Sequence, residues 1–240
     1  GDVYKRQQSA LSFGHFLKQL GDYPAESLYE TIPKFHDTVK RFRDFKDALR
    51  KDVKNRARLC REEIEFVLAR EDDCGVLMKQ LEEGILPLRV THNDTKLNNI
   101  LFDKNTGEGL CIIDLDAIMP GLAANDFGDS IRFGASTAEE DEKDLNKVHF
   151  DIELYRIYVK GYLEMAKDVL TPAENASLPW GARLMTLECG MRFLADFLQG
   201  DVYFKTTYPE HNLVRARTQF RLVKEMEEQF DQMQEIVETF

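Results

Sequence analysis

The residues best suited to chemistry lie in segment 92–99, His-Asn-Asp-Thr-Lys-Leu-Asn-Asn, which has the form H-x-D-x-K-x-x-N. A second acidic element follows, in which the apolar pair Ile112-Ile113 leads into Asp114. Kinase-type phosphoryl transfer needs such groups together: one Asp accepts the proton of the attacking hydroxyl, while an Asn five residues later and a strand-end Asp hold magnesium on the nucleotide phosphates. The protein does little covalent chemistry in this reaction, so correctly placed charges provide most of the catalysis.

Short strands must position these groups. Residues 88–91 predict a strand before the motif. Residues 100–113 predict a β-hairpin after it, because two apolar runs flank segment 103–109, which is rich in turn formers. A loop followed by a hairpin brings Asn99 and Asp114 to the same end of the structure, as two ligands of one metal require.

The same residues also admit a purely structural interpretation. His92, Asp94 and Asn99 could cap turns, and Asp114 and Asp116 could be solvated carboxylates at a strand end. His, Asp and Asn at these offsets arise by chance in roughly one in a hundred chains of this length, which favours the catalytic interpretation. Three carboxylates near one point would repel one another without a cation, and magnesium suits such an oxygen-rich site.

These segments resemble the C-terminal lobe of the aminoglycoside-phosphotransferase-like kinases, which share the protein-kinase fold. The more specific similarity is to the sugar kinase branch, the N-acetylhexosamine 1-kinases. It extends from about Ser9 to the C-terminus. The segments that carry it are 32–38, 91–103, 113–116, 119–121 and 126–132.

The resemblance implies catalytic roles for four residues of the loop and the hairpin. Asp94 is expected to be the base, and Asn99 and Asp114 the ligands of Mg²⁺. Lys96 is expected beside the transferred phosphoryl group, where it would neutralise developing charge. The implied cofactors are therefore Mg²⁺ and ATP.

For the acceptor, the resemblance implies that Asp116 faces the sugar or a second metal. By order and spacing, Arg192 and Tyr203 are expected to contact the sugar. Alternatively, Arg192 forms an internal i, i+4 ion pair with Asp196, and the aromatic loop around Tyr203 merely covers the core.

Three residues are expected to support the catalytic loop structurally: His92, Asp126 and Asp129. The two carboxylates either cap the following helix or brace the loop by accepting from backbone N–H groups, and bracing agrees better with the family. Asn93 stands where the wider family often has Gly, and Asn tolerates unusual backbone angles better than most residues.

Apolar residues at helical spacing predict a mainly helical chain around the hairpin. Segment 181–199 is largely apolar, so we expect it at the centre of the domain. Pro172 is expected to open a helix. The predicted helices cover residues 9–20, 37–83 with a break at Gly75, 126–134, 147–169, 181–199 and 211–238.

The predicted fold class is therefore mainly α (α+β), the C-terminal lobe of a protein-kinase-like fold, with a small β-hairpin beside the catalytic loop. Residues 1–8 are expected to be a leader that is non-native or poorly ordered, and 9–240 the lobe. Within the lobe, segment 90–130 holds the catalytic and metal loops and 147–240 the acceptor-site helices. No Gly-rich loop or strand Lys of an N-terminal lobe precedes the motif, so we expect a fragment of a longer reading frame that is inactive alone.

The net charge of −11, with 31% charged residues, argues against nucleic acid and an anionic membrane as partners. An acidic surface suits a neutral or cationic acceptor, although it also simply favours solubility. The sequence has no signal peptide and no run of about 18 apolar residues, and the four scattered cysteines make zinc improbable, so a cytoplasmic location is expected. The sequence leaves the oligomeric state open.

The resemblance thus implies an ATP-dependent kinase acting on the anomeric hydroxyl of an N-acetylhexosamine. An aminoglycoside or choline (amino-alcohol) kinase is the alternative of the same class, and a non-catalytic kinase-like binding module is the alternative of a different class. An acidic cluster in the acceptor pocket would favour a cationic acceptor. Arg192 in that pocket would favour a neutral, hydroxyl-rich one.

Overall fold

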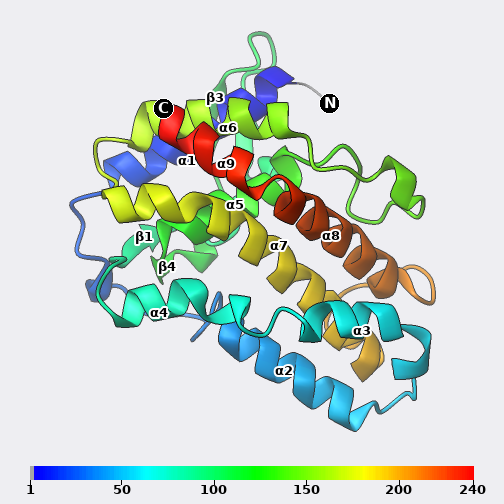
Figure 1. The fold of residues 1–240 in the computed structure, drawn as a ribbon. Coiled ribbons are helices and arrows are strands. Elements are labelled where there is room, and N and C mark those ends of the chain that lie inside the picture. The colour runs from blue at the N-terminus through cyan, green and yellow to red at the C-terminus, as the bar shows by residue number, and fades with distance from the viewer. Residues whose placement is uncertain (1–2) are drawn as a thin grey trace.

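The computed structural model describes residues 3–240, and these form a mainly helical domain with two short pairs of strands (Figure 1). The helices are α1 (Val3–Gln19), α2 (Thr38–Lys51), α3 (Arg61–Leu68), α4 (Val76–Glu82), α5 (Ala123–Gly134), α6 (Ile152–Ala166), α7 (Pro172–Gln199), α8 (His211–Glu228) and α9 (Phe230–Thr239). The strands are β1 (Arg89–Thr91), β2 (Ile100–Phe102), β3 (Gly109–Ile112) and β4 (Met119–Gly121). The predicted fold class is confirmed.

Local signals set the ends of the helices. Helix α7 begins with a capping box between Thr171 and Glu174, with Pro172 in its first turn, as predicted. It ends at Gly200, whose φ of 99° only glycine adopts easily. Helix α6 starts at 152 rather than 147, because the carboxylate of Asp151 accepts hydrogen bonds from the first N–H groups of the helix.

The helical stretch predicted over residues 37–83 is interrupted earlier than expected. Asp52 ends α2 in the left-handed conformation, and its carboxylate accepts from the backbone N–H groups of Arg56 and Ala57. Such local side-chain bonds offer the backbone an alternative to helix. A second interruption separates α3 from α4 near Gly75, where one was predicted.

The predicted hairpin is confirmed. Strands β2 and β3 pair antiparallel, with Ile100 opposite Ile112. Strand β1 pairs antiparallel with β4, with Thr91 opposite Met119, a pairing that the sequence did not predict. The predicted catalytic loop, residues 92–99, therefore connects two separate two-stranded sheets.

Helix α7 runs through the middle of the domain, between α1, α6 and α9 on one side and α2, α3 and α4 on the other (Figure 1). It packs closely against α5, where a Cβ on Gly128 would collide with the carbonyl oxygen of Gly181. Two clusters of buried apolar side chains flank this contact. One contains Phe127 and Tyr158, and the other contains Phe45 and Phe197. Both clusters fix α5, the helix that supports the catalytic loop.

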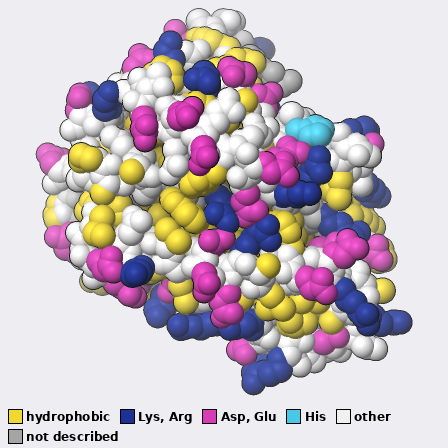
Figure 2. Space-filling view, in the orientation of Figure 1, with side chains coloured by type: hydrophobic (Ala, Val, Ile, Leu, Met, Phe, Trp, Pro, Cys, Tyr) yellow, Lys and Arg dark blue, Asp and Glu magenta, His cyan; other side chains and the backbone are white. Residues whose placement is uncertain are grey.

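Helix α1 begins at Val3, inside the segment expected to be a leader. Arg6 donates to the carbonyl oxygen of Ser136, and Gln8 accepts from the backbone N–H of Gly109. Acidic and basic side chains are interspersed on the face shown in Figure 2. Among residues 3–240, no helix has the length and apolar character needed to cross a membrane.

Candidate active site

The catalytic loop joins β1 to β2 and contains one residue in a rare backbone conformation. Asn93 has φ of 65°, in the left-handed region that Asn tolerates better than most residues. Its amide nitrogen donates to the carbonyl oxygens of Ala117, at 2.8 Å, and Thr91, at 3.2 Å. Asn at this position therefore ties the loop to the segment before β4.

Two carboxylates of α5 hold the backbone of this loop. Asp126 accepts from the N–H groups of His92, at 2.7 Å, and Asn93, at 2.8 Å, through its two oxygens. Asp129 accepts from the N–H of Thr95 at 2.9 Å. Both carboxylates are buried. Burial raises the pKa of Asp126 to about 6, against the opposing effect of its two N–H donors.

His92 joins the loop to the segment that carries Asp114. Its Nε2 lies 3.0 Å from the carbonyl oxygen of Ile113, which can only accept, and its Nδ1 accepts from the backbone N–H of Asp94 at 3.3 Å. These partners require the neutral tautomer with the proton on Nε2. The ring is fully buried, with the edge of Phe13 against it.

Three of the predicted catalytic side chains meet at Asp94. Lys96 Nζ lies 2.8 Å from Asp94 Oδ2, and the amide nitrogen of Asn99 donates to the same oxygen at 2.9 Å. The Asp94 side chain is about one-third exposed, and Asn99 is buried. Because the side-chain amide nitrogen of Asn99 donates to Asp94, the oxygen of the same amide group points away from Asp94.

Asp114 follows β3 in the left-handed conformation, with φ of 63°. The backbone N–H of Ile113 donates to the carbonyl oxygen of Asn99 at 2.9 Å, so the hairpin places Asn99 and Asp114 next to each other in space. An amide oxygen and a carboxylate are ligands that Mg²⁺ accepts, and it completes its shell with water and phosphate oxygens. The residues present therefore fit magnesium.

One expectation about this site is wrong. In the part of the chain that the structure describes, no three His, Cys, Asp or Glu side chains gather in a group that could hold a metal. Asp94, Asp114 and Asp116 thus do not form a three-carboxylate cluster. Asp94 is instead paired with Lys96, and Asp116 lies exposed on a short 3-10 helix.

Two of the predicted acceptor residues, Arg192 and Tyr203, line a cavity of about 450 Å³ between α2, the end of α7 and the loop that follows it, and Asp116 does not line this cavity. The guanidinium of Arg192 lies 5.4, 5.8 and 5.5 Å from the ring centres of Phe35, Tyr203 and Phe204. Such distances allow cation–π attraction. Tyr203 is 71% exposed, so its ring forms the open side of the pocket.

The alternative ion pair between Arg192 and Asp196 is wrong. Asp196 accepts from the backbone N–H groups of residues 202–204 and from the amide of Asn212. These donors fold the loop that carries Tyr203 back onto α7. Within the described residues, the side chain of Arg192 has no hydrogen bond or ion pair to another protein group.

Sequence reasoning missed His36 and Glu188, which connect the pocket to the catalytic loop. His36 Nδ1 lies 2.9 Å from Glu188 Oε1, and its Nε2 lies 3.2 Å from the carbonyl oxygen of Asn93. Burial alone lowers the pKa of His36, but the hydrogen bond to Glu188 and its charge raise the pKa above the usual value. The only signal in the sequence was the family-like segment 32–38.

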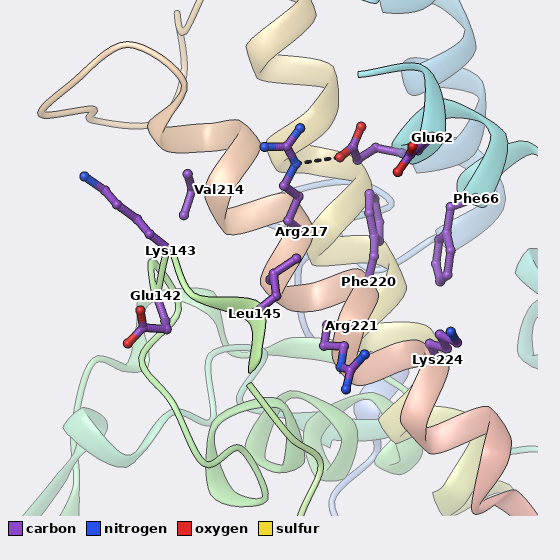
Figure 3. A pocket seen from close by; sticks show the side chains of 11 residues that line it. Glu62, Phe66, Glu142, Lys143, Leu145, Val214, Arg217, Phe220, Arg221 and Lys224 are labelled. Atoms are coloured by element: carbon purple, nitrogen blue, oxygen red, sulfur yellow. Dashed lines mark hydrogen bonds and ion pairs between the residues drawn. The ribbon is translucent and has the colours of Figure 1, made fainter. Parts of the chain in front are cut away.

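Two other cavities lie apart from the Arg192 pocket. One of about 560 Å³ is lined by α3, α8 and residues of segment 142–145, with the ring of Phe66 beside that of Phe220 (Figure 3). None of the predicted site residues lines it. Lys96 lines another cavity, of about 590 Å³, together with Lys147.

A helical domain whose catalytic loop lies between two short antiparallel strand pairs is the C-terminal lobe of a protein-kinase-like fold. The model of the phosphotransferase enzyme family matches residues 3–166, more than half of the chain, and the chain belongs to this family. Arg192 and Tyr203 lie beyond the matched region.

The crystal structure of choline kinase from Cryptosporidium parvum Iowa II is similar to this chain, with a TM-score of 0.60 and 16% sequence identity. The similarity covers 96% of this chain and 66% of the choline kinase. At this identity the likeness shows a shared fold, and the chain spans about two-thirds of that protein's length.

Proposed function

We propose that the protein is an ATP-dependent small-molecule kinase whose acceptor is a sugar hydroxyl, the anomeric hydroxyl of an N-acetylhexosamine. Membership of the phosphotransferase enzyme family supports the reaction class. The observation that carries the proposal is the arrangement at Asp94, whose carboxylate is paired with Lys96 and Asn99 in a loop that α5 braces.

In this proposal Asp94 accepts the proton of the attacking acceptor hydroxyl through its partly exposed carboxylate. Lys96, 2.8 Å from Asp94, places a positive charge where negative charge develops on the transferred group. Asn99 and Asp114 would hold Mg²⁺, which neutralises charge on the nucleotide phosphates when bound. His92, Asp126 and Asp129 keep the loop in this geometry. The proposed role of Asp116 is to contact the acceptor.

The charges of the Arg192 pocket support a neutral acceptor. Its acidic side chains already have partners within the protein: Asp44 with Lys40 at 2.7 Å, Asp47 with Arg50 at 2.9 Å, and Asp196 with three backbone N–H groups. Among the described residues that line the pocket, the side chains of Lys51, Arg192 and Gln199 have no hydrogen bond or ion pair, and of these Arg192 carries the planar guanidinium with its five N–H groups. It would bind an oxygen-rich acceptor and repel a cation.

The aromatic side chains of the pocket lead to the same preference. Phe35, Tyr203 and Phe204 could in principle surround a quaternary ammonium group such as that of choline. That place is taken by the guanidinium of Arg192. Choline therefore has no free aromatic cage in this pocket, whereas a sugar face can stack on the exposed ring of Tyr203.

The test is magnesium-dependent release of ADP from ATP, measured with protein made from the complete reading frame. The acceptors compared are N-acetylglucosamine, N-acetylgalactosamine, an aminoglycoside and choline, with Asp94→Asn as the control. Turnover on an N-acetylhexosamine that the substitution abolishes supports the proposal. Turnover on choline or the aminoglycoside keeps the mechanism but refutes the acceptor. No turnover by correctly folded protein favours the binding-module alternative.

A further inference from the structure

We propose that His36 is a positioning residue, whose doubly protonated ring ties the backbone carbonyl of Asn93 to Glu188 on α7 and so orients the neighbouring Asp94. The inference rests on the proposed function in one respect, the role of Asp94 as the base. The geometry of the three contacting groups is independent of that role.

The charge of His36 follows from its two partners. The carbonyl oxygen of Asn93 has no proton to donate, so the Nε2 facing it at 3.2 Å carries one. The proton between Nδ1 and Glu188 Oε1, 2.9 Å apart, belongs to the stronger base, and imidazole is more basic than a carboxylate. Both ring nitrogens of His36 therefore donate, and the ring is an imidazolium.

The peptide bond between Asn93 and Asp94 is held at both ends by histidines. His36 donates to its carbonyl oxygen, and His92 Nδ1 accepts from its N–H at 3.3 Å. Since Asn93 has a left-handed φ of 65°, this peptide lies in a conformation that the surroundings must maintain. Its orientation decides where the side chain of Asp94 points.

Glu188 connects this peptide to the acceptor pocket. It lies one helical turn before Arg192 on α7, so both side chains lie on the same face. Its other oxygen accepts from the hydroxyl of Thr38 at 2.9 Å. Phe35, whose ring lies against His36 at 4.4 Å, also lies beneath the guanidinium of Arg192. The peptide that carries Asp94 and the acceptor pocket are thus connected through His36 and Glu188.

The charged groups around His36 favour the imidazolium. Glu188 faces it from α7, and the carboxylates of Asp126 and Asp129 act on it from α5. On α2, Arg41 interacts with Glu188 rather than with the ring. A raised pKa means that the stabilisation from this link is complete below about pH 6.5 and is lost as the pH rises through the pKa of the folded state.

The first test is an NMR titration of the ring nitrogens of His36 and the amide of Asp94 in the ¹⁵N-labelled chain. His36→Gln identifies the ring signals. We expect a pKa for His36 above 6.5. Glu188→Gln should lower this pKa by about one unit, a tenfold change in proton affinity. The amide signal of Asp94 should shift with the same midpoint as the ring of His36. A pKa at or below 6.5, or an Asp94 amide that does not follow it, would overturn the inference. This outcome does not depend on turnover.

The second test is the pH profile of kcat for the acceptor that is turned over. We expect kcat to fall as the pH rises through the pKa of His36. His36→Gln should remove this pH dependence and lower kcat about 10- to 100-fold, because a small misplacement of a reacting group has effects of this size. Thr38→Val is the matched control, because it removes the other hydrogen bond of Glu188 and leaves both bonds of His36. If Thr38→Val lowers kcat as much as His36→Gln, the role is structural and the inference fails. If no acceptor is turned over but the titrations agree, the proposed function fails and the positioning link remains.

Discussion

The catalytic loop and the Arg192 pocket are adjacent but are held together in different ways. The loop is fixed through its backbone, with N–H groups of His92, Asn93 and Thr95 bound to buried carboxylates of α5. The pocket consists of side chains, and Tyr203 is 71% exposed. Hydrogen bonds from the backbone of the loop depend on two side chains of α5 and not on the side chains that the loop itself carries, whereas the walls of the pocket change with each substitution. In the proposed kinase, the geometry of the reacting groups should therefore vary less than the choice of acceptor.

The largest effect is expected from Asp94→Asn. If Asp94 is the base, as proposed, kcat should fall about 10²- to 10⁴-fold, the usual contribution of general base catalysis. Thermal stability should change little, because the side chain is about one-third exposed and keeps its size. ADP release and thermal unfolding measure the two effects. Asp103→Asn, in an exposed turn outside the site, is the control, and an equal loss in that variant would mean that the effect is not specific to Asp94.

Asp126→Ala tests the bracing of the loop. Removing this carboxylate leaves two buried N–H groups without partners, each costing about 1–3 kcal/mol, so the free energy of unfolding should fall by a few kcal/mol. The matched control is Asp103→Ala, which also removes an acceptor of two backbone N–H groups, but in an exposed turn where water replaces it. Chemical denaturation gives both values. Equal losses in the free energy of unfolding would show that the buried hydrogen bonds of Asp126 contribute no more stability than exposed ones.

Arg192→Ala should act on the pocket and leave the loop intact. A hydrogen bond to a charged group contributes about 1.5–3 kcal/mol, so KM for a sugar acceptor should rise roughly 10- to 100-fold while KM for ATP stays unchanged. Arg192→Lys keeps the charge but not the planar donor geometry, and should be intermediate. Improved turnover of choline in Arg192→Ala would support the view that the guanidinium excludes cations. A change in ATP affinity instead would contradict the separation of pocket and loop.

The proposed catalytic side chains could be predicted from sequence because they lie close together along the chain. Asp94, Lys96 and Asn99 lie within six residues, and Asp114 returns through one hairpin. Short-range spacing and turn residues contain enough information for such a unit.

The pocket could not be predicted in the same way. Spacing places Asp196 one turn after Arg192, yet backbone N–H groups of the folded-back loop bind it instead. His36 and Glu188 are 152 residues apart, and only the packing of α2 against α7 brings them together. Pairings of this kind depend on tertiary structure, which the periodicity of single helices does not contain.

The smallest effect is expected from Tyr203→Ala. The ring is mostly exposed, and stacking of an aromatic ring contributes about 0.5–1.5 kcal/mol, so KM for the acceptor should rise less than roughly tenfold with kcat unchanged. Phe204→Ala is the comparison, because Phe204 also contacts Phe193 of α7 and its loss should reduce stability as well. Steady-state kinetics and thermal unfolding of both variants separate contact with the acceptor from packing. If Tyr203→Ala lowers kcat by as much as His36→Gln, the pocket wall is coupled to Asp94, and the difference between fixed loop and adaptable pocket does not hold.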